Sequence, residues 1–192
     1  MGELETRHKN LLDASNSVLL IVDVQERFRP HIEGYSALVA ATVTLVKACE
    51  TLAVPIIVSE QYTKGLGPTV DEIKKSEGSS APWHYFEKNC FSAVGASGFE
   101  DCLVKLGRKQ IIVCGIETHV CVNQTVHGLL ARGFEPHVVV DAVASRSATN
   151  KEIGLQKMFA SGAHPTTVEM ALFEMLVEAG TVKFKEVQSL VK

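Results

Sequence analysis

The chain has 192 residues, of which 46% are hydrophobic and 21% are charged, and its net charge is −3. This balance is typical of a folded globular domain and is sufficient for one substantial core. The sequence has no basic block, which argues against a nucleic-acid partner, and no apolar run of the roughly 18 residues that a membrane span requires. Its five cysteines lack the spacing of a disulfide framework or a metal site, which predicts a reducing, cytoplasmic environment.

The first sixteen residues are polar and carry charges of both signs. They lack the apolar segment of a secretory signal. Mitochondrial presequences are poor in acidic residues, so Glu3, Glu5 and Asp13 argue against that kind of signal. We therefore expect a flexible leader over residues 1–16 and a single domain over residues 17–192. The start Met-Gly-x-x-x-Thr matches the loose myristoylation pattern, although the carboxylate of Glu3 beside Gly2 disfavours that modification.

Two continuous apolar runs predict the central strands. The first covers residues 17–22 and ends at Asp23, and the second begins at Ile111 and is broken by Gly115. Strands that are apolar on both faces are typical of a parallel sheet covered by helices. Further strands are predicted over residues 54–58, 83–88, 135–140 and 165–168. Helices are predicted over residues 37–52, 99–106, 149–160, 171–179 and 182–191, with another following Thr118 and ending by Gly133.

The alternation of strands and helices predicts an α/β fold, a three-layer α/β/α sandwich with a six-stranded parallel sheet of order 3-2-1-4-5-6. In this order the first strand lies beside the fourth, where the winding of the sheet reverses. Ligands bind at such a point, outside the carboxyl ends of the strands. Asp23 and Cys121 are therefore expected to meet there, although they are far apart in the sequence.

Cys121 follows the fourth predicted strand and is a candidate nucleophile. Thr118 offers a hydroxyl for an N-cap, which would place Cys121 near the first turn of a helix. The partial positive charge of a helix start favours a thiolate, so we expect the pKa of Cys121 to lie below the ordinary value of about 8.5. The alternative is that Cys121 is a small buried hydrophobic residue.

Asp23 and Lys88 are candidate partners of this thiol. Asp23 would accept the thiol proton as a general base, and Lys88 would balance the negative charges. The alternatives are that Asp23 caps the next turn and that Lys88 is an ordinary solvated lysine. Cys90, two residues after Lys88, is a rival reactive thiol.

Three motifs together resemble the isochorismatase-like cysteine hydrolases, the superfamily that includes nicotinamidases and N-carbamoylsarcosine amidohydrolases. The motifs are Leu-Ile-Val-Asp-Val-Gln at 20–25, Phe-Glu-Lys at 86–88 and Gly-Ile-Glu-Thr-His-Val-Cys-Val at 115–122. The resemblance covers about Ser17 to Ala179. The sequence at 60–67 is most similar to the isochorismatase domain-containing branch.

This resemblance implies that Asp23, Lys88 and Cys121 form a catalytic triad. It also implies a cis peptide bond between Ile116 and Glu117, with the backbone N–H groups of Glu117 and Cys121 forming an oxyanion hole. A homo-oligomer is a further implication. We expect that Gln25, Phe28, Tyr62, Trp83 and Thr118 line the substrate pocket. The alternative for the three aromatic residues is a place in the core or in an interface.

Departures from the family pattern restrict which metal, cofactor and substrate are expected. Nicotinamidases have an Asp-x-His metal motif after the second strand, where this chain has Ser59-Glu60-Gln61-Tyr62, and His84 alone is too isolated to replace it. We therefore expect no catalytic metal and no cofactor, and nicotinamide becomes a doubtful substrate. The isochorismatases of siderophore synthesis lack the cysteine, so the presence of Cys121 argues against isochorismate as the substrate.

The sequence thus predicts a metal-independent cysteine hydrolase that acts on a small amide or carbamoyl compound through an acyl-enzyme. One alternative is a binding or scaffold protein that keeps the fold and has lost turnover. Another is a thiol-redox protein that uses Cys121 with Cys90 or Cys114, although no Cys-x-x-Cys motif is present.

Overall fold

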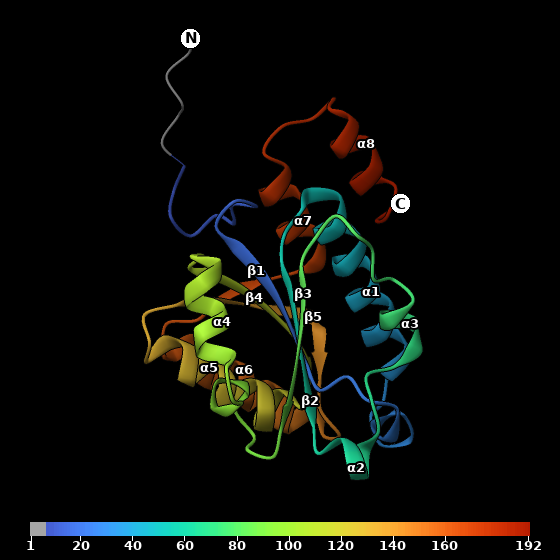
Figure 1. Cartoon of the computed structure of the whole chain (residues 1–192), viewed down its shortest axis with the longest axis vertical. Helices are drawn as coiled ribbons and strands as arrows, with labels where there is room; N and C mark the ends of the chain where they lie inside the picture. Colours follow the sequence, from blue (N-terminus) through green and yellow to red (C-terminus); the bar gives the residue numbers. More distant parts are fainter. Residues whose placement is uncertain (1–6) are drawn as a thin grey trace.

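The computed structural model describes residues 7–192. Six parallel strands form one sheet in the order β3-β2-β1-β4-β5-β6, with helices on both faces (Figure 1). The predicted strand order and three-layer architecture are therefore confirmed. The strands are β1 (Ser17–Val22), β2 (Ile56–Gln61), β3 (Trp83–Lys88), β4 (Gln110–Ile116), β5 (Glu135–Ala144) and β6 (His164–Thr166).

The helices form two layers, each with its own apolar cluster. One layer contains α1 (Tyr35–Leu52), α3 (Asp71–Lys74), α7 (Val168–Leu176) and α8 (Val182–Gln188). The other contains α4 (Phe99–Leu106), α5 (Asn123–Leu130) and α6 (Ala148–Ala160). Short connecting turns complete the described chain: η1 (Glu26–His31), α2 (Thr63–Leu66), η2 (Ala93–Gly95) and η3 (Thr118–Val122).

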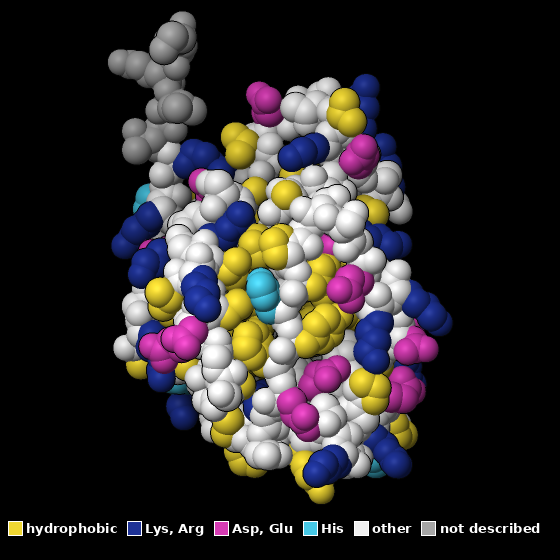
Figure 2. Space-filling model, in the orientation of Figure 1, with side chains coloured by type: hydrophobic (Ala, Val, Ile, Leu, Met, Phe, Trp, Pro, Cys, Tyr) yellow, Lys and Arg dark blue, Asp and Glu magenta, His cyan; other side chains and the backbone are white. Residues whose placement is uncertain are grey.

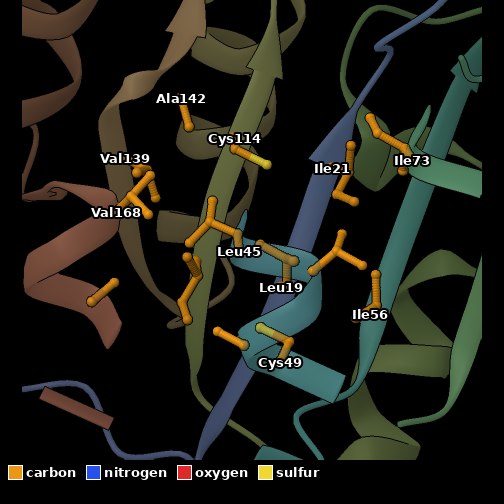
Figure 3. Packing of buried hydrophobic residues seen from close by; sticks show 14 of the residues in the cluster. Leu19, Ile21, Leu45, Cys49, Ile56, Ile73, Cys114, Val139, Ala142 and Val168 are labelled. Atoms are coloured by element: carbon orange, nitrogen blue, oxygen red, sulfur yellow. The ribbon is translucent and has the colours of Figure 1, made fainter. Parts of the chain in front are cut away.

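The core forms because the central strands are buried on both faces. Every residue of β1 is buried, and alternate side chains enter the two apolar clusters. On one face Leu19 and Ile21 lie near Leu45 and Cys49 of α1 (Figure 3). Helix α1 is long and apolar enough, by length and composition, to cross a membrane, so the expectation that no segment reaches this length is wrong. In this fold its apolar side chains instead cover the sheet, as in the core helix of a globular protein.

A glycine allows the two central strands to meet at their carboxyl ends. Gly115 of β4 is paired in register with Val22 of β1 and has a φ of +114°. A Cβ atom at this position would lie 2.1 Å from the carbonyl oxygen of Val22, so a larger residue would force the strands apart. This close approach brings the residues that follow the strands, Asp23 and Glu117, to the same edge of the sheet.

Strand β5 is longer than the sequence pattern predicted. It continues past Asp141 to Ala144, after an irregularity in its pairing with β4 between Val113 and Gly115. Asp141 therefore lies within the strand and does not end it, and its carboxylate accepts a hydrogen bond from the backbone N–H of Val168. The extension carries the chain to the edge of the sheet where Asp23 lies.

The segment before β1 is packed against the domain. Leu12 is fully buried, its backbone N–H donates to the carboxylate of Glu174, and Gln110 donates to two backbone carbonyls of the segment. The prediction of a flexible leader is therefore wrong for residues 7–16, because Leu12 adds to the core. Residues 1–6, with the myristoylation pattern at Gly2, lie outside the described residues.

His137 gives the fold a pH dependence. Its side chain is buried in β5 beside His164, with the ring centroids 4.8 Å apart, and burial lowers the pKa of His137 to about 4. Between this value and the ordinary 6.5 the unfolded chain binds a proton that the folded chain does not, so stability falls as the pH decreases. We expect a loss of about 3 kcal/mol between pH 7.5 and pH 4.

Urea unfolding at a series of pH values tests this expectation. The His137→Phe variant should lose most of the decrease, because it has no proton to bind at that position. An equal decrease in the variant and the parent protein would assign the effect to other groups.

Candidate active site

The strand order brings Asp23, Lys88 and Cys121 together at the carboxyl edge of the sheet. Asp23 follows β1, Lys88 is the last residue of β3, and Cys121 lies in the η3 turn after β4. The side chains of Lys88 and Asp23 are 0% and 1% exposed, and Cys121 is 8% exposed. A carboxylate, an ammonium and a thiol are thus buried in one place.

The Asp23 carboxylate is bound at both oxygens. The Ser59 hydroxyl donates to Oδ1 at 2.7 Å, and the Lys88 ammonium donates to Oδ2 at 2.7 Å. Burial raises the pKa of Asp23, while Lys88 and Ser59 favour the ionised form and oppose that increase. The backbone at Asp23 is left-handed, with φ at +52°, which turns the chain sharply at the end of β1.

Lys88 is bound in the interior. Its ammonium also donates to Oε1 of Gln61 at 2.6 Å and to the backbone carbonyls of Phe91 and Cys90 at 3.0 and 3.3 Å. The alternative of a solvated lysine is therefore wrong. Because all its protons have acceptors close by, the charge of Lys88 is held in place rather than free to move toward solvent.

Cys121 lies in a π turn, and its surroundings disfavour a resting thiolate. Burial raises the pKa of Cys121 to about 12, the negative charge of Asp23 adds to the increase, and Lys88 opposes it. The predicted lowering of this pKa is wrong, because desolvation of the sulfur outweighs any effect of the helix start. The thiol therefore needs a proton acceptor at the moment it reacts, and Asp23 is beside it.

The turn that carries Cys121 is also not capped as the sequence predicted. Thr118 is the first residue of the turn and does not precede it, and its hydroxyl is buried without a hydrogen-bond partner among the described residues. The preceding peptide bond, between Ile116 and Glu117, is cis. The backbone carbonyl of Glu117 accepts hydrogen bonds from the N–H groups of Val120 and Val122. This carbonyl closes the turn in place of a side-chain cap.

Side-chain contacts hold the same turn from outside. The buried carboxylate of Glu117 accepts hydrogen bonds from Nε and from the backbone N–H of Arg146, both at 3.0 Å. Gly154 of α6 packs so closely that a Cβ atom there would lie 3.1 Å from the Cα atom of His119. The backbone around Cys121 is thus fixed from two sides.

The predicted pocket residues have different positions. Tyr62 follows β2 at the site edge and is 51% exposed, whereas Phe28 is partly buried and packs against the α1-side core. Gln25 is buried, and its amide binds the backbone of Gln61 and of Gly67. Gln25 therefore joins the end of β2 to the end of α2 instead of presenting its amide to a ligand.

Trp83 does not lie at the site. It is the first residue of β3, and its indole N–H donates to Glu50 at the end of α1. In a parallel strand this position is at the amino edge of the sheet, opposite to Lys88. The prediction that Trp83 lines the pocket is therefore wrong, because the short stretch between Trp83 and Lys88 is a complete strand.

Three residues of the site were missed in the sequence. Ser59 and Gln61 lie two residues apart near the end of β2. Their place directly after an apolar run could have predicted that they lie at the carboxyl edge of the sheet. Arg146 had no such signal, because its position depends on the unexpected length of β5.

A cavity beside β3 lies apart from this trio, and the described residues contain no cluster of metal ligands. In residues 7–192 no group of three or more His, Cys, Asp or Glu side chains is arranged to hold a metal ion. A cavity of about 330 Å³ lies between β3 and α4, where Figure 2 shows hydrophobic side chains around a histidine. Its lining includes His84, Phe86 and Cys102, and none of the trio.

Comparison with known proteins identifies relatives over nearly the whole chain. Residues 17–170 match the model of the isochorismatase domain family. The isochorismatase domain-containing protein 2 of Danio rerio is 40% identical over 180 residues, covering 93% of this chain and 88% of the relative. The secreted isochorismatase effector Isc1 of Phytophthora sojae is 38% identical over 195 residues, covering 100% of this chain and 93% of the relative.

Solved structures have the same architecture. The structure described as the MAR1 ribonuclease from Caenorhabditis elegans has a TM-score of 0.87 and 39% identity, and the match covers 94% of this chain and 91% of that one. YcaC from Escherichia coli, described as an octameric hydrolase of unknown specificity, has a TM-score of 0.85 at 22% identity, covering 96% and 92% of the two chains. The latter likeness concerns the fold alone.

Proposed function

Because the chain belongs to the isochorismatase family, we propose that it is a cysteine hydrolase that cleaves a small amide or carbamoyl compound through an acyl-enzyme. The observation that carries the proposal is the buried contact between Lys88 and Asp23, with the Cys121 thiol close enough for both charges to act on its pKa. Covalent catalysis by a thiol requires a nucleophile, a base and a balancing cation close together, and these three groups are buried together at the carboxyl edge of the sheet.

The proposed reaction begins with a proton transfer. Asp23 accepts the proton of Cys121 while the sulfur attacks the carbonyl carbon of the substrate, and the N–H groups of Glu117 and Cys121 stabilise the oxyanion. Protonated Asp23 then gives the proton to the leaving nitrogen, and a thioester remains. Water attacks the thioester while Asp23 takes a proton from that water. As the carbon–sulfur bond breaks, Asp23 returns this proton to the sulfur, so the acid product leaves and the Cys121 thiol and the Asp23 carboxylate are restored.

The pKa values explain why the base must be adjacent. With the pKa of Cys121 at about 12, the thiolate is scarce near neutral pH, so proton transfer and attack must be coupled. Asp23 must be ionised to accept the proton, and its pKa is raised by burial. The rate should therefore fall on the acidic side, at a pH above the ordinary carboxylate value.

Burial also favours a small substrate. None of the three side chains is more than 8% exposed, so a bulky molecule would have to displace the surrounding loops before it touched the sulfur. A primary amide or a carbamoyl group is small enough to reach the sulfur without displacing these loops.

RNA cleavage is a second candidate because the Caenorhabditis elegans relative is described as a ribonuclease. The net charge of −3 and the burial of the trio favour the small amide. A scaffold role without turnover is the remaining alternative. A redox role that pairs Cys121 with Cys114 is disfavoured, because the two side chains lie in apolar clusters on opposite faces of the sheet.

Mass spectrometry of the intact protein distinguishes these functions. The protein is mixed with a panel of small amides and carbamoyl compounds and quenched in acid, while a labelled RNA oligonucleotide is incubated in parallel. We expect an acyl mass increase that peptide mapping assigns to Cys121, with ammonia or an amine released. Cleavage of RNA without any adduct would support the ribonuclease, and neither reaction would support the scaffold.

We also propose that the chain forms a homo-oligomer, as the description of the Escherichia coli YcaC protein as octameric suggests. Analytical ultracentrifugation of the whole chain tests this, and a mass of one chain at micromolar concentration would contradict it.

A further inference from the structure

Gln61 forms the least expected contact of the site. It is the last residue of β2, and its carbonyl Oε1 accepts a hydrogen bond from Lys88 Nζ at 2.6 Å. This distance is as short as that between Lys88 and Asp23. The buried ammonium thus has one charged and one neutral side-chain acceptor, and only the charged one belongs to the triad of the proposed function.

The orientation of the Gln61 amide is set by a second hydrogen bond. Its Nε2 donates to the backbone carbonyl of Asn89 at 2.8 Å. A flipped amide would place an NH₂ group against the ammonium and an oxygen against a carbonyl, so both contacts would become repulsive. Oε1 therefore faces Lys88.

The backbone of Gln61 is held as firmly as its side chain. The amide of Gln25 accepts from the Gln61 N–H at 2.9 Å and donates to the Gln61 carbonyl at 3.0 Å. Gln25 lies two residues after Asp23, so one short segment positions both the carboxylate and the neutral acceptor of Lys88. Gln61 is therefore fixed relative to Asp23 and not only to its own strand.

We propose that Gln61 is a positioning residue that holds Lys88 without adding charge and thereby sets the pH range in which Asp23 can accept the proton of Cys121. This inference rests on the proposed function. A neutral acceptor leaves Asp23 as the one carboxylate in contact with the ammonium among the described residues. A second carboxylate would share that positive charge and disfavour the ionised forms of Asp23 and Cys121.

Apart from Asp23, none of the acidic side chains on the adjoining described segments binds the Lys88 ammonium beside Gln61. Asp23, Lys88 and Cys121 face one another from β1, β3 and η3. The titratable side chains on adjoining segments bind elsewhere: Glu60 to the N–H of Thr69, Glu87 to Thr63, Glu117 to Arg146, His119 to the hydroxyl of Ser145, and the thiol of Cys90 to the carbonyl of Ser92.

The pH profile of Cys121 alkylation tests the proposal without a substrate. Iodoacetamide is the probe, and mass spectrometry of the Cys121 peptide gives the rate between about pH 4 and pH 10. The thiol itself, with a pKa of about 12, does not titrate in this range, so the midpoint of the profile reports the ionisation of Asp23, the base that takes the thiol proton. We expect Gln61→Glu to raise the midpoint of the profile by about one pH unit, since the added charge opposes ionisation. Gln156→Glu adds the same charge at an exposed position of α6 and should leave the midpoint unchanged.

An unchanged midpoint in folded Gln61→Glu would overturn the proposal, because a merely structural glutamine would not move it. Folding is checked by thermal melting. Should this variant not fold, Gln61→Asn keeps the amide but shortens its reach to Lys88, and an alkylation rate within twofold of the parent would overturn the proposal. The proposed function fails separately, when no acyl-enzyme forms with any amide in a protein whose alkylation profile does shift.

Discussion

Replacement of Cys121 with alanine is expected to abolish hydrolysis, with a loss of at least about 10⁴-fold in kcat. The sulfur is the atom that forms the thioester in the proposed reaction, and Cys121 is the one described thiol whose pKa is affected by both Asp23 and Lys88. The measurement is release of ammonia or an amine from whichever amide forms an adduct with the parent protein.

Two further variants make this result specific. Cys121→Ser keeps the size of the side chain but has a far less acidic hydroxyl, so it should be nearly as inactive as the alanine variant. Cys102→Ala removes a partly buried thiol in α4 that contacts none of the trio and should retain activity. Hydrolysis by Cys121→Ala at the parent rate would contradict the covalent mechanism.

Replacement of Lys88 with methionine is expected to cost about 3–5 kcal/mol of stability at neutral pH, as well as activity. The change keeps the length of the side chain and leaves the Asp23 carboxylate buried without its ion pair. In this variant the pKa of Asp23 is raised further, since Lys88 no longer opposes the effect of burial. Its folded form then prefers the protonated acid, so its loss of stability relative to the parent protein should be smallest at low pH and should grow as the pH rises.

Urea unfolding of four proteins measures this effect. Lys88→Met combined with Asp23→Asn removes the unpaired charge and should be more stable than Lys88→Met alone. Lys75→Met breaks an exposed ion pair with Asp71 and should cost less than about 1 kcal/mol. Equal destabilisation by the Lys88 and Lys75 variants would show that the buried pair contributes no more than a surface pair.

The order of the sheet and the identity of the trio were predictable because they depend on patterns close in the sequence. Continuous apolar runs end at Asp23 and Glu117, and parallel strands place their carboxyl ends at one edge. The motif around Cys121 and its relation to Asp23 and Lys88 then led to the same family that the comparisons identify. The misplacement of Trp83 had a local cause, since the beginning and end of a six-residue strand lie at opposite edges.

The sequence by itself determined which elements form, in what order they lie side by side, and which acid, amine and thiol end up at the same edge. Only the tertiary structure decided the protonation of Cys121 and the partners of Lys88. The pKa of the Cys121 thiol depends on how completely water is excluded from the sulfur and on the charges of Asp23 and Lys88, which follow other strands. Neither can be predicted from the residues next to Cys121 in the sequence. Likewise, Gln61 reaches Lys88 and Arg146 reaches Glu117 only after β2, β3, β4 and β5 have paired.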